Sequence, residues 1–358
     1  MRKHVVSLML VAAVSPAFAQ VPDLVEEDKV KQALDETAKL EAEKPVEGWQ
    51  FKADVGFNGG FNHSSTVVGQ PDGSTLQLGL AINTAADLYA GQHEWHNALT
   101  FGYQQTKTPA IDVFVKTSDN LDLVTMWLYK PAAMPWLGPF ARARLQTQLF
   151  AGYIVFGEDK NVAIRDVDGN QVADGLDPAT DADGNVIDGQ NYLPAQKQYQ
   201  LTKAFEPLTL RESIGAFARA LDRNDLKVTF TAGLGAQEVF TRDGFTLSDD
   251  DKTSQIEIKQ LQDSLQLGVE VSAEAGGTIS QQITWSLLAN VLHPFIIEAD
   301  TDLTGLDLTN IELGGKLGVK LAKWASLDYV ITAKRVPLVL DDWQIQNGIL
   351  LSTAFNLL

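Results

Sequence analysis

Strict alternation of apolar and polar residues dominates the stretch from Ile311 to Lys334. Apolar residues occupy every second position from Ile311 to Leu321, apart from Gly315, and from Ala325 to Ile331. Glycine, hydroxyl and charged residues stand between them, apart from Val330. A period of two is typical of a β-strand, because successive side chains leave opposite faces of the pleat. A three-residue turn puts both runs on one face and predicts a hairpin. This ribbon fits either a soluble sheet over a core or a membrane barrel with its apolar face on lipid.

The same alternation recurs along the chain from Trp49 onward. Each predicted strand is long enough for the roughly 9–11 residues of a tilted membrane crossing. With a first strand that begins at Trp49, the alternation predicts twelve strands. The other eleven lie at about 74–88, 93–106, 119–130, 138–152, 205–220, 225–240, 263–276, 279–293, 307–321, 325–335 and 346–358.

Short and long connections alternate between these predicted strands. The expected short connections lie around residues 90–91, 131–137, 222–224, 276–278 and 322–324. The expected long connections are 63–73, 107–118, 153–204, 241–262, 294–306 and 336–345. This parity is typical of periplasmic turns and extracellular loops in an outer-membrane barrel. An even number of strands also returns both ends of the barrel to the periplasm.

Tryptophans mark the strand ends that meet the short connections. Trp49, Trp95, Trp127, Trp136 and Trp324 all fall there, where an interfacial aromatic girdle is expected. Together with the alternation and the connection lengths, this placement favours lipid over a soluble core. We therefore predict an all-β fold, a twelve-stranded antiparallel transmembrane β-barrel over residues 49–358 in the cell outer membrane.

The N-terminal residues predict export. Arg2 and Lys3 precede the short apolar run Val5–Val14, and Ala17-Phe18-Ala19 matches a signal-peptide cleavage site. Residues 1–19 are therefore expected to be a signal peptide. No other stretch reaches the roughly 18–20 apolar residues of a spanning helix, so a membrane form of this chain requires a barrel.

Residues 20–48 are expected to form a short periplasmic helical leader. The segment is dense in Glu, Lys and Ala, and Glu27 and Lys31 stand at i,i+4 spacing. Val30 and Leu34 give only a thin apolar stripe. Two interpretations stay open for this leader: a solvated helix, or a helix that docks on a periplasmic partner.

Composition narrows the classes of function. The net charge of −18 argues against nucleic acid as a partner, because phosphate binding requires clustered Lys and Arg. The absence of cysteine removes disulfides and thiolate metal sites. His93 and His96 lack a companion zinc ligand, and Ser286 and His293 lie on opposite parities of one strand. The chain is therefore expected to be non-enzymatic.

Charged residues on the polar parity are expected to face the barrel lumen. The four arginines of this set come from adjacent strands and are expected to crowd one wall, and Lys316 and Asp328 are diagonal neighbours in the opening hairpin. Two interpretations stay open: a salt-bridged interior that fills a narrow barrel, or a pore with a basic arc that favours anions. The candidate lumen residues are Arg142, Arg144, Arg211, Arg219, Glu270, Glu312, Lys316, Lys320 and Asp328.

Residues 157–192 are expected to form an acidic extracellular loop. The motif D-x-D-G-N, the start of a calcium-binding loop, occurs twice there, but both copies lack the turn glycine and the final Glu. Two interpretations stay open for this segment: a site for Ca²⁺ or for divalent ions that bridge lipopolysaccharide, or a merely solvated loop. The candidate ligands are Asp166, Asp168, Asn170, Asp177, Asp181, Asp183 and Asn185.

Several segments resemble a known family. GWQFKADVGFNGGFN, HEWHNALTFGYQQTK, SDNLDLVTMWLY, LTKAFEPLTLRESIGAFARAL and the end ILLSTAFNLL are similar to an uncharacterised group of Gram-negative outer-membrane barrels, domain of unknown function 3078. The chain departs from this family at 67–73, VVGQPDG, where the family carries a Trp and paired glycines. The resemblance implies architecture and location but brings no activity.

The leading functional hypothesis is a narrow passive channel with a partly basic lumen. The alternative is a structural or surface-binding barrel with a sealed lumen that acts through the loop 157–192, and the third is an outer-membrane hydrolase. The expected partners are outer-membrane lipid and lipopolysaccharide, with a periplasmic partner for the leader. No cofactor is expected apart from Ca²⁺ in the acidic loop.

Overall fold

A computed structural model describes residues 47–66, 72–172, 175–223, 225–249, 252–280, 282–299, 301–322, 325–338 and 340–356. The expected signal peptide and nearly all of the expected leader lie outside these residues, as does Trp324. In the described part of the chain, no helix is long and apolar enough to cross a membrane.

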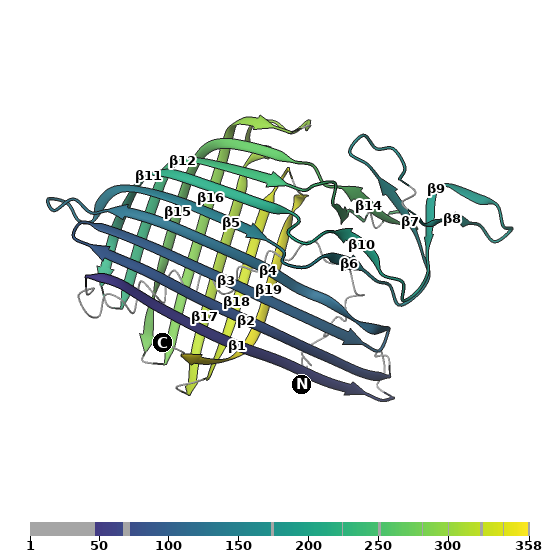
Figure 1. Ribbon diagram of the computed structural model, residues 1–358, viewed down its shortest axis with the longest axis horizontal. Coiled ribbons are helices and arrows are strands. Elements are labelled where there is room, and N and C mark those ends of the chain that lie inside the picture. The colour runs from purple at the N-terminus through teal and green to yellow at the C-terminus, as the bar shows by residue number, and fades with distance from the viewer. Residues whose placement is uncertain are drawn as a thin grey trace, which may run out of the picture.

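Twelve strands pair in a closed barrel (Figure 1). Their order around the barrel is β1-β19-β18-β17-β16-β15-β12-β11-β5-β4-β3-β2, and every pair between neighbours is antiparallel. The all-β, antiparallel prediction is confirmed. The bounds are β1 (Gly48–Ser64), β2 (Gly73–Ala90), β3 (His93–Thr108), β4 (Ile111–Tyr129), β5 (Leu137–Thr147), β11 (Leu208–Arg223), β12 (Leu226–Phe240), β15 (Ser264–Ser280), β16 (Ile283–Glu298), β17 (Asn310–Ala322), β18 (Ala325–Val336) and β19 (Leu340–Asn356).

Two connections are much shorter than predicted. Thr108 pairs with Ile111, so only two residues join β3 to β4, where a loop over 107–118 was expected. Val336 pairs with Leu340, so the expected loop 336–345 is also a tight turn. Pro109 explains the first error, because proline suits a tight turn as well as an open loop. The strict alternation of short and long connections is therefore wrong at these two places.

The outer surface of the barrel is apolar and the inner surface is mostly polar. On β11, Ile214 is 61% exposed, whereas Arg211 and Ser213 on the opposite parity are buried. On β12, Phe230 and Leu234 point outward in the same way. The two faces thus follow the period of two that the sequence predicts. Other large apolar side chains exposed on barrel strands include Phe51, Phe57, Trp95, Leu123, Trp127, Val269, Val271, Leu287, Val291, Leu313, Leu317, Leu327 and Ile331.

Two small sheets lie beyond one end of the barrel (Figure 1). One pairs β6 (Gly152–Ile154) with β10 (Tyr199–Thr202). The other has the order β13-β14-β7-β9-β8, and its β7 and β14 are parallel. Its strands are β7 (Lys160–Arg165), β8 (Asp177–Thr180), β9 (Val186–Leu193), β13 (Phe245–Leu247) and β14 (Ile256–Gln260). A single 3-10 turn, η1 (Gly305–Leu308), precedes β17.

A hydrophobic core holds these sheets together. Ile154, Val162, Ile164, Leu193 and Ile258 are almost completely buried in one cluster. Residues 157–192 are therefore not a solvated loop, because they supply three strands of a folded sheet. We call this unit, residues 152–202 and 245–260, the outer sheet unit.

Candidate functional site

Arginines crowd one wall of the lumen, as the strand parity predicted. Arg142 and Arg144 lie on β5, and Arg211 and Arg219 lie on the adjacent strand β11. Arg144 and Arg211 are direct register partners across the two strands. Such like charges directly opposite each other are destabilising unless anions lie between them.

Glu270 supplies one such anion from the far side of β12. Its Oε1 pairs with Arg142 Nη2 and lies 3.2 Å from Arg211 Nη2, and it also accepts a 2.7 Å hydrogen bond from Asn290 Nδ2. β12 separates β15 from β11 in the barrel order, so Glu270 must pass over β12. Gly235 allows this passage, because a Cβ atom there would lie 2.7 Å from Glu270 Oε2.

Glu312 links the arginine wall to the opposite side of the barrel. Its Oε2 lies 3.5 Å from Arg211 Nη1 and 3.8 Å from Arg144 Nη1. Glu312 belongs to β17, which lies five strands from β5 in the ring of twelve. These ion pairs therefore span the lumen from wall to wall.

These contacts form a balanced charged layer. Arg144 also donates from Nε to Asp122 Oδ2 on β4 at 2.9 Å. The expected basic arc is thus neutralised, because each of its four arginines contacts a carboxylate, Arg219 that of Glu94. We call this group the cross-lumen layer; its charged members are Arg142, Arg144, Arg211, Asp122, Glu270 and Glu312.

An apolar layer lies next to it on the side of the short turns. Phe140 on β5, Phe217 on β11 and Leu128 on β4 are buried against one another, with Met126 packed on them. They stand on the same parity as the arginines, a few residues nearer the short turns. The strand parity alone did not predict them, because inward positions were expected to be polar.

A second charged cluster follows at the short-turn end. Arg219 Nη2 lies 3.1 Å from Glu94 Oε2, and Lys130 pairs with the same carboxylate. His96 lies between Asp87 Oδ1 at 2.8 Å and Glu94 Oε2 at 3.5 Å. The sequence analysis considered His96 only as a zinc ligand. Its position on the inward parity of β3 could have indicated that it pairs with carboxylates inside the barrel.

The remaining candidate lumen residues lie apart from these layers. Lys316 Nζ contacts Asp328 Oδ2 at 3.2 Å, which confirms the diagonal pair predicted in the opening hairpin. Lys320 is exposed next to the turn that joins β15 to β16, where its backbone N–H donates to the carbonyl of Gln282. It therefore takes no part in the cross-lumen layer.

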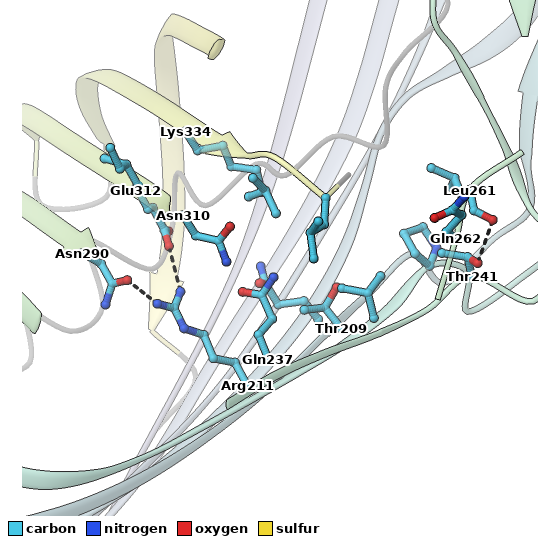
Figure 2. A pocket seen from close by; sticks show the side chains of 16 residues that line it. Thr209, Arg211, Gln237, Thr241, Leu261, Gln262, Asn290, Asn310, Glu312 and Lys334 are labelled. Atoms are coloured by element: carbon cyan, nitrogen blue, oxygen red, sulfur yellow. Dashed lines mark hydrogen bonds and ion pairs between the residues drawn. The ribbon is translucent and has the colours of Figure 1, made fainter. Parts of the chain in front are cut away.

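A pocket lies in the lumen next to the cross-lumen layer, at the end of the barrel that carries the long connections (Figure 2). It has about 880 Å³ of empty space, open solvent included. Figure 2 shows Arg211, Asn290 and Glu312 on one side of the pocket and Thr241, Leu261 and Gln262 on the other. The lining also contains Gln146, Pro207, Thr209, Gln237, Val239, Asn310, Ile311, Lys334, Val336 and Leu338.

The two D-x-D-G-N motifs form matching hairpin turns. Asp166 Oδ1 accepts the backbone N–H groups of Asp168 and Asn170, and Asp181 Oδ1 accepts those of Asp183 and Asn185. The glycine of each motif has a positive φ, +82° at Gly169 and +84° at Gly184, as a left-handed turn position requires. The motif is thus explained by the needs of a turn.

Hydrogen bonds also lower the pKa of each leading carboxyl. The Asn170 side chain holds the pKa of Asp166 below its usual value, and Asn185 does the same for Asp181. In the part of the chain that the structure describes, no three acidic or histidine side chains are grouped as a metal ion requires. Asp177 stands on β8, outside both turns. The arrangement therefore does not support the predicted calcium site.

Residues 68–153 match the family described as "Protein of unknown function (DUF3078)". The match confirms the resemblance over these residues. Two of the segments that carried the resemblance, on β3 and β4, lie within it. The curated proteins contain no match.

Several solved structures are similar at low identity. The translocator domain of the autotransporter NalP from Neisseria meningitidis is 8% identical, with 92% of this chain and 95% of that chain covered and a TM-score of 0.37. An outer membrane channel from Pseudomonas putida F1 is 9% identical, with 88% and 98% covered and a TM-score of 0.36. The beta domain of a Bordetella autotransporter is 11% identical, with 86% and 99% covered and a TM-score of 0.32.

Proposed function

We propose that the protein is a non-enzymatic outer-membrane β-barrel whose lumen is closed to free diffusion and which receives a ligand at its loop-side face. The observation that carries this proposal is the pair of contacts from Arg144 and Arg211 to Glu312 across the lumen. The proposal favours the sealed barrel over the open anion channel. It includes the expected export by residues 1–19 and contact with outer-membrane lipid and lipopolysaccharide.

The outer surface supports the membrane location. Side chains such as Ile214, Phe230 and Leu287 are between 45% and 61% exposed on the outside of a closed barrel. In water this surface would be a large exposed apolar patch, which soluble monomers rarely carry. In a bilayer it contacts acyl chains, and closure leaves no unpaired strand edge in the hydrocarbon.

The sequence of layers supports a closed lumen. A solute that enters from the loop side meets the cross-lumen layer, then the apolar layer, then the cluster around Glu94. Breaking the first layer exposes buried charges that have lost their partners, which typically costs several kcal/mol. The apolar layer adds a stretch without groups that can replace the hydration of an ion.

The test is the conductance of refolded protein in a planar lipid bilayer. We expect the native protein and the matched control Glu158→Gln, which changes only an exposed ion pair with Lys160, to be silent. A variant that changes all three layers, Arg144→Ser with Arg211→Ser, Phe217→Ser and Arg219→Ser, is expected to conduct. Discrete steps from the native protein overturn the closed-lumen proposal. A silent four-site variant that keeps the folded gel mobility of a barrel shows that these layers do not close the lumen.

Location is tested separately, by fractionation of cells that express the full chain. We expect the protein in the outer-membrane fraction. Recovery in the soluble periplasmic fraction would overturn the membrane part of the proposal.

A further inference from the structure

The loop-side pocket has polar atoms without partners at its inner end. Arg211 Nε, Asn310 Oδ1 and Glu312 Oε1 are shielded from solvent and have no hydrogen-bond partner among the described residues. Arg211 and Asn310 are more than nine-tenths buried. A buried donor or acceptor without a hydrogen bond typically costs about 1–3 kcal/mol of stability. We therefore expect these atoms to form hydrogen bonds with a molecule that is not part of the chain.

The three atoms require a ligand group that both donates and accepts. Arg211 Nε is a donor, whereas Asn310 Oδ1 and Glu312 Oε1 are acceptors. A carboxylate or phosphate can accept from Arg211 but repels Glu312. An ammonium group can donate to Asn310 and Glu312 but is repelled by Arg211. A hydroxyl group can accept from one of these atoms and donate to another, and a sugar ring carries several hydroxyls.

The charged groups at the inner end of the pocket already have partners of opposite charge. Arg211 contacts both Glu270 and Glu312. A ligand with a net charge therefore has to compete with these ion pairs. This pairing favours a neutral ligand over an acidic or a basic one.

The rest of the lining has the same character. Amide and hydroxyl side chains alternate around the pocket with aliphatic ones. Amides offer paired donors and acceptors, and the aliphatic groups can cover the C–H faces of a ring. The polar members are Gln146, Thr209, Gln237, Thr241, Gln262, Asn290 and Asn310, and the apolar members are Pro207, Val239, Leu261, Ile311, Val336 and Leu338.

We infer that this pocket binds a neutral, hydroxyl-rich ligand of the mono- or disaccharide class. The inference deepens the proposed function, because it names what the loop-side face receives. Binding at this depth places the ligand against the cross-lumen layer, with Arg211 and Glu312 shared between the two (Figure 2).

The experiment is calorimetric titration of the refolded full chain in detergent with maltose. Gluconate, glucosamine and the neutral dipeptide amide N-acetyl-glycylglycinamide serve as competitor classes. Asn310→Ala and Gln262→Leu change the pocket from its inner and outer sides. Ser286→Ala is the matched control, because Ser286 Oγ is also buried without a partner but does not line the pocket.

We expect saturable binding of maltose that is at least tenfold weaker in Asn310→Ala and Gln262→Leu and unchanged in Ser286→Ala. Tighter binding of a charged probe or of the dipeptide amide overturns the ligand class. No saturable binding, or binding that both pocket variants retain, overturns the site. The Gln262→Leu variant keeps the test valid if Asn310→Ala fails to fold. Conductance on the same preparation separates the two proposals. A silent barrel that does not bind maltose overturns the ligand inference and leaves the closed-lumen proposal standing.

Discussion

Arg144 and Arg211 face each other in register on β5 and β11, and both approach the same oxygen, Glu312 Oε2, from across the lumen. Two guanidinium groups in this position repel each other unless carboxylates lie close by. Carboxylates from distant strands supply this compensation, and in the proposed function the same contacts close the lumen. The proposal therefore makes stability and closure depend on the same few residues.

Glu270→Gln is expected to destabilise the barrel strongly. The substitution leaves Arg142 and Arg211 buried without their shared counterion, and removing one partner of a buried ion pair typically costs about 3–5 kcal/mol. The measurement is the urea midpoint of the refolded barrel in lipid. Glu158→Gln, whose side chain is 77% exposed, should leave the midpoint unchanged. Equal midpoints for the two variants would contradict the assignment.

Gly235→Val is expected to weaken the same layer without removing any charge. The new Cβ would lie only 2.7 Å from Glu270 Oε2 and 3.0 Å from Glu270 Cβ, so the Glu270 side chain must shift and its contacts with Arg142 and Arg211 weaken. We expect a lower urea midpoint and, in a bilayer, transient openings. Ala236→Val, a substitution on the outward parity of β12, is the control and should change neither quantity. A silent, fully stable Gly235→Val variant would show that Glu270 does not depend on this space.

Ile214→Lys tests the lipid-facing surface. Ile214 is 61% exposed on the outside of β11, and lysine at the middle of a bilayer typically costs about 2–4 kcal/mol in a barrel. The free energy of unfolding in lipid vesicles should fall by about this amount. Val186→Lys, equally exposed but on β9 of the outer sheet unit, should have no such effect. If both variants behave alike, Ile214 does not contact lipid.

The hairpin turns at Asp166 and Asp181 should loosen in acid. Their pKa values are lowered in the folded protein, chiefly by the Asn170 and Asn185 side chains. A lowered pKa means that the stabilisation is present above the unfolded value of about 3.9 and is lost as the pH falls through the folded value. Amide hydrogen exchange at Asn170 and Asn185, corrected for its intrinsic pH dependence, should therefore lose protection below about pH 4.

Asp166→Asn should abolish this pH dependence at the first turn and leave the second turn as its internal control. The amide keeps an oxygen that can accept the two backbone N–H groups but has no charge to lose. Persistent acid loosening at Asn170 in this variant would assign the titration to another group.

The sequence periodicity predicted which side chains point into the barrel but not which of them touch across the lumen. The parity of β5 and β11 put four arginines on one inner wall, and Lys316 and Asp328 on a diagonal, as the structure has them. It did not predict that Glu312 reaches Arg144, because that contact depends on how far apart β17 and β5 lie across the lumen. The inward Phe140 and Phe217 were missed because a narrow lumen can be filled by apolar side chains as readily as by ion pairs.

The acidic segment was predicted as a loop, and its two motifs fit more than one description. A calcium loop and a tight hairpin turn both use an aspartate that accepts backbone N–H groups and a glycine with positive φ. The motifs at Asp166 and Asp181 satisfy both descriptions, so the sequence alone could not separate them. The strands around them were missed because they are short and because β7 pairs with β14, nearly a hundred residues further along the chain.

That parallel pair has a consequence for biogenesis. β7 lies in the segment between β5 and β11, and β14 in the segment between β12 and β15, so the barrel must first bring these four strands together. Contacts so distant in sequence form slowly and late. In the predicted orientation, with the outer sheet unit outside the cell, an antibody that recognises only the joined β7 and β14 would report completed insertion at the surface of intact cells.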